Sequence, residues 1–404
     1  MKRLLTFFLI CFSFVEYTRA EDIINYKYWD EGKLTWDDFQ DTLSLKGVPS
    51  AFNAFLRIEK TEKRDGNTRT IRPEAQACFD KRHSFADRQI QNENLLRLFQ
   101  LKYDLLEMYR RRLQTELNLG VVGIAADNRT RQYMDLYTEQ SKKAEQETEN
   151  GQNEIKLQEW EFYVTKELIE NPAPSIPRIS PRRFGYGFYL GTGASFPVGS
   201  IADYWDPAWQ INVGFDLAYA NTHLLCDFSA GTARTRQEIT VSNGQITDTW
   251  LRNGHNTYTS ISLGIGQQLI STKYFALMPY VGCIWSGYSD QAKIQEGRNE
   301  RTTLSYTNFN WTAGICFDYR FSTTISLVPS FWRGHREIFT ASIRTKLFIN
   351  REQFHNFKIA PDDNGSMLRG CKLGFSVACL GFSRLLQIKP QIRNYAPNMI
   401  QKRK

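Results

Sequence analysis

The chain has 404 residues, which is enough for two or three domains, and 14% of them are aromatic. Its net charge of +8 is compatible with nucleic acid, but the Lys and Arg residues are scattered and no nucleic-acid motif accompanies them, so we exclude that class. None of the seven Cys residues forms a CxxC pair, which excludes a zinc ribbon and a dense disulfide scaffold.

The first twenty residues have the pattern of a secretory signal peptide. Lys2 and Arg3 precede the mostly apolar segment Leu4–Val15, and Thr18-Arg19-Ala20 resembles a signal-peptidase site. We therefore expect residues 1–20 to be removed before Glu21 and the rest to be exported. No later segment reaches the about 18 apolar residues of a helical span. An exported chain of this kind would cross a membrane only as a closed barrel.

Residues 21–170 are predicted to form a periplasmic domain with long helices. Residues 21–90 are mixed and include short strands. Residues 92–118 form the clearest helix, because apolar side chains recur at three- and four-residue steps and no Gly or Pro interrupts them before Gly120. Residues 129–170 are charged with few apolar positions, which predicts one or two solvated helices broken near Gly151.

The segment Leu34–Leu117 contains two motifs and a looser match between them. It opens with Leu34-Thr35-Trp36-Asp37-Asp38-Phe39 and continues with Ala77-Cys78-Phe79-Asp80 and Ser84-Phe85. The long helix then carries Leu95-Leu96, Tyr103-Asp104, Glu107 and Arg111-Arg112-Leu113. Together these residues resemble a family of secreted bacterial domains of unknown function with zinc-peptidase-like sequences, whose helix has the form LLxHExxHFDxxExxxRxL.

The resemblance implies a zinc site that this chain has lost. In HExxH two His on one helix face bind zinc and the Glu acts as general base. Leu98, Phe99 and Lys102 stand at those positions, and His83 is the only His in residues 21–183. Apolar side chains and a protonated Lys do not bind zinc. We therefore expect no catalytic, cofactor-binding or metal-binding residues, and expect Glu107 to be a surface or hydrogen-bonding residue.

A change of period follows a stretch rich in Pro. Pro172, Pro174, Pro177 and Pro181 predict a stiff linker over residues 171–183. After it, apolar residues alternate with polar ones, which is typical of strands. Within residues 184–349 we expect eight strands, at 184–196, 209–219, 222–234, 257–270, 275–288, 308–321, 324–332 and 338–349.

The predicted connections alternate in length. Ala220-Asn221, Ser271–Tyr274 and Ser322-Thr323 are expected to be tight turns, whereas residues 197–208, 235–256 and 289–307 are long polar loops. Aromatic residues lie near the outer strand ends at Phe196, Trp209, Trp285, Trp311, Phe331 and Phe339, and near the inner ends at Tyr219, Phe275, Tyr319 and Phe321. These features favour a transmembrane barrel over a soluble β-sandwich or lipocalin-like barrel.

Charged residues fall on the other face of the strands, at Asp216, Asp227, Asp318, Arg320, Arg344 and Lys346. Because an unpaired buried charge is costly, we expect an ion-pair network that fills a narrow lumen. By architecture this half resembles small outer-membrane barrels of the OmpA and OmpX type. His223, His255, His335 and His355 are expected to be polar surface residues.

Residues 350–404 are interpreted as a C-terminal tail in the periplasm. A ninth strand at Cys371–Phe382 would break the even count of bacterial barrels. Cys371 and Cys379 are candidates for a disulfide in an oxidising compartment, which the sequence does not decide.

The sequence thus predicts an α+β periplasmic domain followed by an all-β antiparallel eight-stranded transmembrane barrel. We interpret the chain as a non-enzymatic outer-membrane protein without cofactors. Its barrel contacts outer-membrane lipid, and its periplasmic domain binds an envelope protein or the cell wall. Two alternatives stay open: an envelope enzyme that acts on lipid or cell wall through loop residues such as His255, and a narrow channel.

Overall fold

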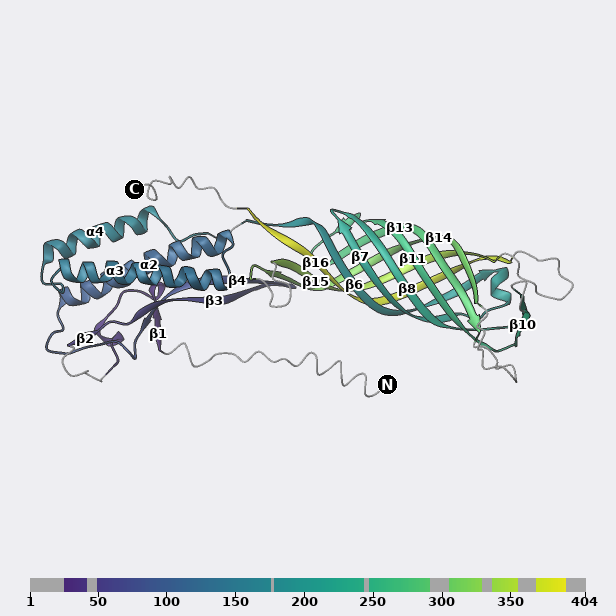
Figure 1. Ribbon diagram of the computed structural model, residues 1–404, viewed down its shortest axis with the longest axis horizontal. Coiled ribbons are helices and arrows are strands. Elements are labelled where there is room, and N and C mark those ends of the chain that lie inside the picture. Colours follow the sequence, from purple (N-terminus) through teal and green to yellow (C-terminus); the bar gives the residue numbers. More distant parts are fainter. Residues whose placement is uncertain are drawn as a thin grey trace. The chain divides into compact units, whose positions relative to one another are not determined.

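The computed structural model describes residues 25–41, 49–175, 178–242, 247–290, 305–328, 336–354 and 368–389. The chain divides into two compact units (Figure 1). The helical unit extends to Glu59 and resumes from Pro73 to Pro177, and the barrel unit contains Lys60–Arg72 and the chain from Arg178 onward. The predicted signal peptide, residues 1–20, lies outside the described residues.

Three helices dominate the helical unit. The helix α2 (Glu93–Leu119) packs against α3 (Ile124–Glu147) and α4 (Glu154–Glu170). The predicted break near Gly151 is confirmed, and Gly151 has a positive φ of 86° there. The remaining elements are β1 (Tyr26–Tyr28), η2 (Trp29–Glu31), η3 (Trp36–Asp38), β2 (Ser50–Ala51), β3 (Ala54–Asp65), β4 (Thr68–Asp80) and β5 (Phe85–Ala86).

Local sequence explains why α2 forms where it does. The Asn92 side chain accepts a hydrogen bond from the Leu95 backbone N–H at 2.8 Å, which caps the first turn. Leu98, Leu105 and Leu113 lie on its buried face and form the core of the unit. Gly120 follows the last turn with a positive φ of 120°, a conformation that favours Gly.

The hairpin of β3 and β4 carries the chain from one unit into the other. Its tip, Lys60–Arg72, belongs to the barrel unit, where Thr68–Ile71 of β4 pairs in parallel with residues 323–326. The prediction that all of residues 21–170 belong to the periplasmic domain is therefore wrong for the tip. Pairing with a strand about 250 residues away leaves no local signal in the sequence.

Eight antiparallel strands form a closed ring in the barrel unit (Figure 1). Each pairs with the next in the chain, and the last pairs with the first, so the ring has no free edge. The strands are β6 (Arg178–Gly199), β7 (Ala208–Tyr219), β8 (Thr222–Arg234), β11 (His255–Gln267), β13 (Phe275–Asp290), β14 (Ser305–Ser326), β15 (Glu337–Phe354) and β16 (Leu368–Lys389). This closure rules out the β-sandwich alternative.

Two of the predicted strands need correction. The predicted turn at Ser322-Thr323 is wrong, because β14 continues to Ser326 through a register shift between Arg320 and Ser322. Residues 308–321 and 324–326 therefore belong to one strand, and the predicted seventh strand does not exist as such. The eighth strand is β16, which the prediction assigned to a tail. A bulge adds one unpaired residue without ending a strand, and a polar Ser-Thr pair resembles a turn.

The boundaries of the barrel move accordingly. The predicted linker over residues 171–183 is wrong from Arg178, because β6 begins there and pairs with the end of β16. The predicted tail is wrong for residues 368–389. Cys371 and Cys379 both lie on β16, eight residues apart on an extended strand, and both are free. That separation is too long for a disulfide.

Short elements mark the two ends of the barrel. We call the end at which β6 begins the linker end, and the opposite one the distal end. The linker end holds the turn at Ala220-Asn221, β12 (Ile270–Ser271) and the hairpin tip. The distal end holds η4 (Ser200–Asp203), β9 (Ile239–Ser242) and β10 (Thr247–Trp250).

The barrel is apolar outside and polar inside. Outward-facing residues with large exposed side chains include Ile211, Phe215, Ile265, Val281, Phe309, Ile315 and Leu347. Inward-facing residues that are buried include Gln210, Asn212, Asp216, Ser229, Thr312, Arg344, Lys346 and Asn350. This is the reverse of a soluble barrel and is typical of barrels in lipid.

Among the described residues, the aromatic side chains at the strand ends follow the prediction with one exception. Trp209, Trp285 and Trp311 are exposed toward the distal end, and Tyr219 and Tyr319 toward the linker end. The prediction for Phe339 is wrong: it lies near the start of β15, at the linker end, because the misplaced turn reversed the direction of its strand. Phe331 lies outside the described residues.

Candidate functional site

The positions that would hold zinc in the resembled family form part of an apolar core. Leu98 and Phe99 are buried on α2. The Phe99 ring lies 5.2 Å from Phe39 and 6.3 Å from Trp36, both from the opening motif, and stacks on Phe52 at 5.5 Å. The two motifs of the resemblance therefore do meet in space, but through aromatic rings that cannot bind a metal ion.

Lys102, at the position of the second His, is also buried. Its Nζ lies 5.1 Å from the centre of the Phe52 ring and 3.6 Å from Glu145. Removal from water lowers the pKa of this amine, and the carboxylate of Glu145 offsets only part of that effect. The surroundings are those of a side chain that fills a core position and reaches toward one acidic partner.

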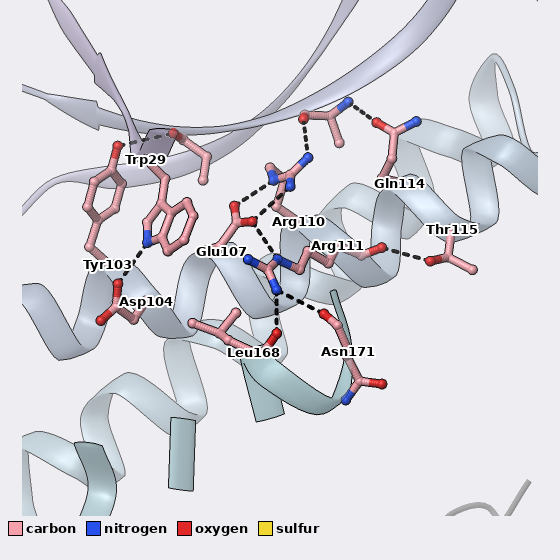
Figure 2. Close-up of polar contacts among 12 residues, drawn as sticks. Trp29, Tyr103, Asp104, Glu107, Arg110, Arg111, Gln114, Thr115, Leu168 and Asn171 are labelled. Atoms are coloured by element: carbon pink, nitrogen blue, oxygen red, sulfur yellow. Dashed lines mark hydrogen bonds and ion pairs between the residues drawn. The ribbon is translucent and has the colours of Figure 1, made fainter. Parts of the chain in front are cut away.

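Glu107 is the centre of a buried clamp (Figure 2). Arg110 Nε donates to its carboxylate at 2.5 Å and Arg111 Nε at 2.7 Å. Arg111 Nη1 also donates to the carbonyl oxygens of Leu168 and Asn171, at the end of α4. Glu107 is thus confirmed as a hydrogen-bonding residue and is not a surface residue, since only 1% of it is exposed.

Asp104, next on the same face of α2, holds the N-terminal segment. Trp29 Nε1 donates to its carboxylate at 2.7 Å (Figure 2). Gln100 Nε2 donates to the same carboxylate at 2.8 Å. Burial raises the pKa of Asp104, although both hydrogen bonds favour its charged form. The acidic residues of the helix therefore join α2 to its neighbours instead of facing an open site.

No metal site is found in the part of the chain that the structure describes: nowhere do three His, Cys, Asp or Glu side chains gather as ligands. His83 Nδ1 lies 2.8 Å from Asp80 and its ring is largely exposed. Likewise, no helix among the described residues is long and apolar enough to cross a membrane.

The lumen of the barrel contains the second group of predicted residues. Arg344 Nη2 donates to Asp216 at 2.8 Å and Arg344 Nε donates to Asp318 at 2.7 Å. Lys346 donates to Asp227 at 2.6 Å. The predicted ion-pair network is confirmed for these five residues. It is wrong for Arg320, whose guanidinium donates to the carbonyl oxygen of Thr272 at the linker end.

Aromatic rings complete this network. Tyr189 donates to Asp227, and its ring lies 5.3 Å from the Arg344 guanidinium carbon and 5.6 Å from Lys346 Nζ. The absence of a side chain at Gly214 leaves room for this ring, since a Cβ there would overlap it. A cavity of only about 30 Å³ remains between Asp227, Lys346 and their neighbours. The middle of the lumen is therefore filled.

A second charge pair, which was not predicted from the sequence, lies toward the distal end. Lys372 Nζ lies 3.2 Å from Glu352, and both are buried. The same amine lies 3.7 Å from the centre of the Tyr258 ring and 4.3 Å from that of Tyr288. Glu352 and Lys372 lie beyond the predicted end of the barrel at residue 349, so the strand alternation was not applied to them.

His223 is the one described histidine for which the surface prediction is wrong. It is only 5% exposed, and its Nδ1 lies 2.7 Å from Asp216. The sequence contained the signal, because His223 is four residues before Asp227 on the same strand and so shares its inward face. His255 is exposed, as predicted, and His335 and His355 lie outside the described residues.

A larger cavity opens beside His223. It has a volume of about 380 Å³ at the linker end of the barrel. Its lining residues with ionisable side chains are His223, Lys273, Asp318, Arg320, Arg344 and Arg384, and its apolar ones are Pro181, Ile325, Ile338, Leu380 and Phe382. The hairpin tip contributes Thr68. The size is in the usual range of small-molecule sites.

Comparison with known proteins adds no family. No family model matches the chain, and no curated protein matches it. The resemblance of Leu34–Leu117 to peptidase-like domains therefore stays a prediction.

Several solved structures are similar to about half of the chain at low identity. One is Ail, the attachment invasion locus protein of Yersinia pestis, at 12% identity and a TM-score of 0.26, with 50% of this chain and 99% of that chain covered. Another is a major outer membrane protein of Thermus thermophilus, at 12% and 0.23, covering 50% and 98%. A third is the N-terminal β-barrel domain of Pseudomonas aeruginosa OprF, at 10% and 0.22, covering 52% and 100%. At such low identities and TM-scores, nothing is inferred from the activities of these proteins. The assignment of a closed barrel depends on the strand pairing of this chain alone.

Proposed function

We propose that this chain is a non-enzymatic outer-membrane protein whose barrel anchors it in lipid and whose helical unit binds a partner in the periplasm. The main support for the proposal is that the barrel is apolar outside and polar inside. Apolar side chains cover its outer surface while charged ones fill its lumen, and in water both arrangements would be costly. A closed ring also satisfies the backbone groups of every strand, as lipid requires.

The filled lumen argues against a channel. Arg344, Lys346 and their carboxylate partners occupy the middle of the barrel. Toward the distal end the buried rings of Trp205, Trp250 and Tyr288 pack together. A continuous aqueous path through these layers would leave paired charges and packed rings without their partners, so an anchor is favoured.

The helical unit supports binding better than catalysis. Core side chains replace the ligands of the resembled zinc site, and the neighbouring carboxylates are held in structural hydrogen bonds. On α4, however, Ile155, Phe162 and Ile169 are 72%, 73% and 74% exposed. Their spacing of seven residues places them in one row, which suits a helix of a protein partner better than a polysaccharide.

Envelope fractionation with gel electrophoresis tests the anchor. We expect the protein in the outer-membrane fraction after salt washing, and we expect its mobility to change on boiling because a folded barrel resists detergent. Release by salt alone, without a mobility change, would mean that the strands do not lie in lipid.

A photo-crosslinking residue at Phe162, with one at exposed Lys142 as control, tests the protein partner. We expect a crosslink to a protein from position 162 and not from position 142. The absence of a crosslink from position 162 would argue against a partner at α4.

A further inference from the structure

The cavity at the linker end has more positive charge than its own carboxylates balance. Lys273, Arg320, Arg344 and Arg384 line it, against the single acidic lining residue Asp318. Arg344 is already paired with Asp216 and Asp318, and Lys273 lies 3.3 Å from Asp65. The guanidinium groups of Arg320 and Arg384 are therefore left to interact with a ligand in the cavity.

Those two groups are held in place by the backbone. Arg320 Nη1 donates to the Thr272 carbonyl at 2.7 Å. Arg384 donates to the carbonyls of Ala220 and Arg183, at 2.5 and 3.4 Å. Neither forms an ion pair with a carboxylate in the described parts of the chain. Both are therefore held in place without a carboxylate bonded to them, although Asp318 attracts Arg320 and Asp216 attracts Arg384 from a greater distance. Oxyanion sites are commonly built from arginines held in this way.

Buried polar atoms without partners lie among the lining residues. His223 is bound through Nδ1 to Asp216, but its Nε2 has no hydrogen-bond partner. Arg344 Nη1 has none either, although Nε and Nη2 of the same group are bound. Such atoms are costly when buried and are normally satisfied by a ligand or by ordered water.

The rest of the wall is apolar. Ile325, Ile338, Leu380 and Phe382 face the cavity together with Pro181. A cavity that joins fixed cations to an aliphatic and aromatic wall matches a ligand with an anionic head and an apolar body.

We propose that this cavity is a binding site for a small amphipathic oxyanion, with its carboxylate or phosphate between Arg320 and Arg384 and its apolar body against Ile338 and Leu380. The site belongs to the barrel unit alone, so it does not depend on the partner of the helical unit. The same chemistry is offered by a free organic acid and by the headgroup of an anionic lipid.

Calorimetric titration of the folded full chain tests the site. The probes are hexanoate and hexyl phosphate, added to protein in nonionic micelles, and nanodiscs with or without phosphatidylglycerol. We expect at least one probe to bind, and expect Arg320→Gln with Arg384→Gln to raise its Kd at least about tenfold, because two charged hydrogen bonds are lost. Arg351→Gln is the matched control, since Arg351 is an exposed arginine of β15 outside the cavity.

A second variant guards against misfolding of the first. Thr68→Glu places a carboxylate at the lining of the cavity without removing either arginine, and we expect it to weaken binding as well. Binding of the soluble probes in micelles would identify a free acid, and binding only with phosphatidylglycerol would identify a lipid headgroup. No binding of any probe, or binding unchanged in both variants while boiling-dependent mobility shows that they are folded, would overturn the proposal.

Discussion

At the scale of single residues, Glu107 has the largest expected effect on the helical unit. Glu107→Gln would leave Arg110 and Arg111 without their buried counter-charge. We expect the free energy of unfolding of the helices to fall by about 3 kcal/mol, as when one partner of a buried ion pair is removed. Urea titration of the full chain, followed by the helical circular dichroism signal, measures it. Glu159→Gln, which breaks the exposed pair with Lys156, should leave the free energy of unfolding almost unchanged.

Lys102 gives a prediction that depends on pH. Because burial lowers its pKa in the folded state, the folded chain binds this proton less readily than the unfolded chain. The cost to stability is fully present below the folded pKa and disappears as the pH rises through about 10.4, the ordinary pKa of Lys. Lys102→Met should therefore be more stable than the natural chain by about 1 kcal/mol at neutral pH. Paired urea titrations should show this difference vanishing in alkaline solution; a constant difference would mean that the pKa is not lowered.

At the scale of elements, the hairpin tip is expected to be held by Asn67. Its side-chain Nδ2 donates to the backbone carbonyls of Arg320 at 2.9 Å and Lys273 at 3.2 Å. The backbone carbonyl of Asn67 accepts a hydrogen bond from the Thr323 N–H at 2.8 Å. Asn67→Ala should release the tip and speed hydrogen exchange at the Thr323 amide by about tenfold or more, since each bond contributes about 1 kcal/mol. Asp65→Asn, which removes an exposed ion pair with Lys273, should have little effect. If the Thr323 amide exchanged at the same rate in the natural chain and in both variants, the Asn67 side chain would not be what holds the tip.

Elements were predictable from the sequence where their signal is local. The apolar period and the absence of Gly and Pro before Gly120 predict α2, and alternation predicts β7 and β8 to within a residue. The β14 bulge near Ser322 was not predictable in this way, because pairing with β15 decides that the strand continues. Because the false turn counted β14 as two strands, β15 was taken as the eighth strand. The true eighth strand, β16, was assigned to the tail together with Lys372. The cavity draws on β6, β8, β14, β15, β16 and the hairpin tip, so only the register of the closed ring brings its residues together.

At the scale of the whole molecule, exposure alone does not distinguish the surfaces of the two units. Val281 on β13 is 61% exposed and Ile124 on α3 is 80% exposed. If lipid covers the barrel and water covers the helices, the same substitution must have opposite consequences at the two positions. Val281→Arg should destabilise the barrel by about 2–4 kcal/mol, the cost of Arg at the lipid face near the middle of a bilayer. Ile124→Arg should be nearly neutral, because an exposed side chain on a helix in water contributes little.

Refolding into phosphatidylcholine vesicles, with the folded fraction read from mobility without boiling, compares the two variants with the natural chain. We expect the folded fraction to fall for Val281→Arg and to be unchanged for Ile124→Arg. Val281→Leu keeps the apolar surface and should fold like the natural chain, which separates the effect of charge from that of size. If Val281→Arg folded as well as Val281→Leu, the outer face of the barrel would not be in contact with lipid. The aromatic residues at its two ends would then need another explanation.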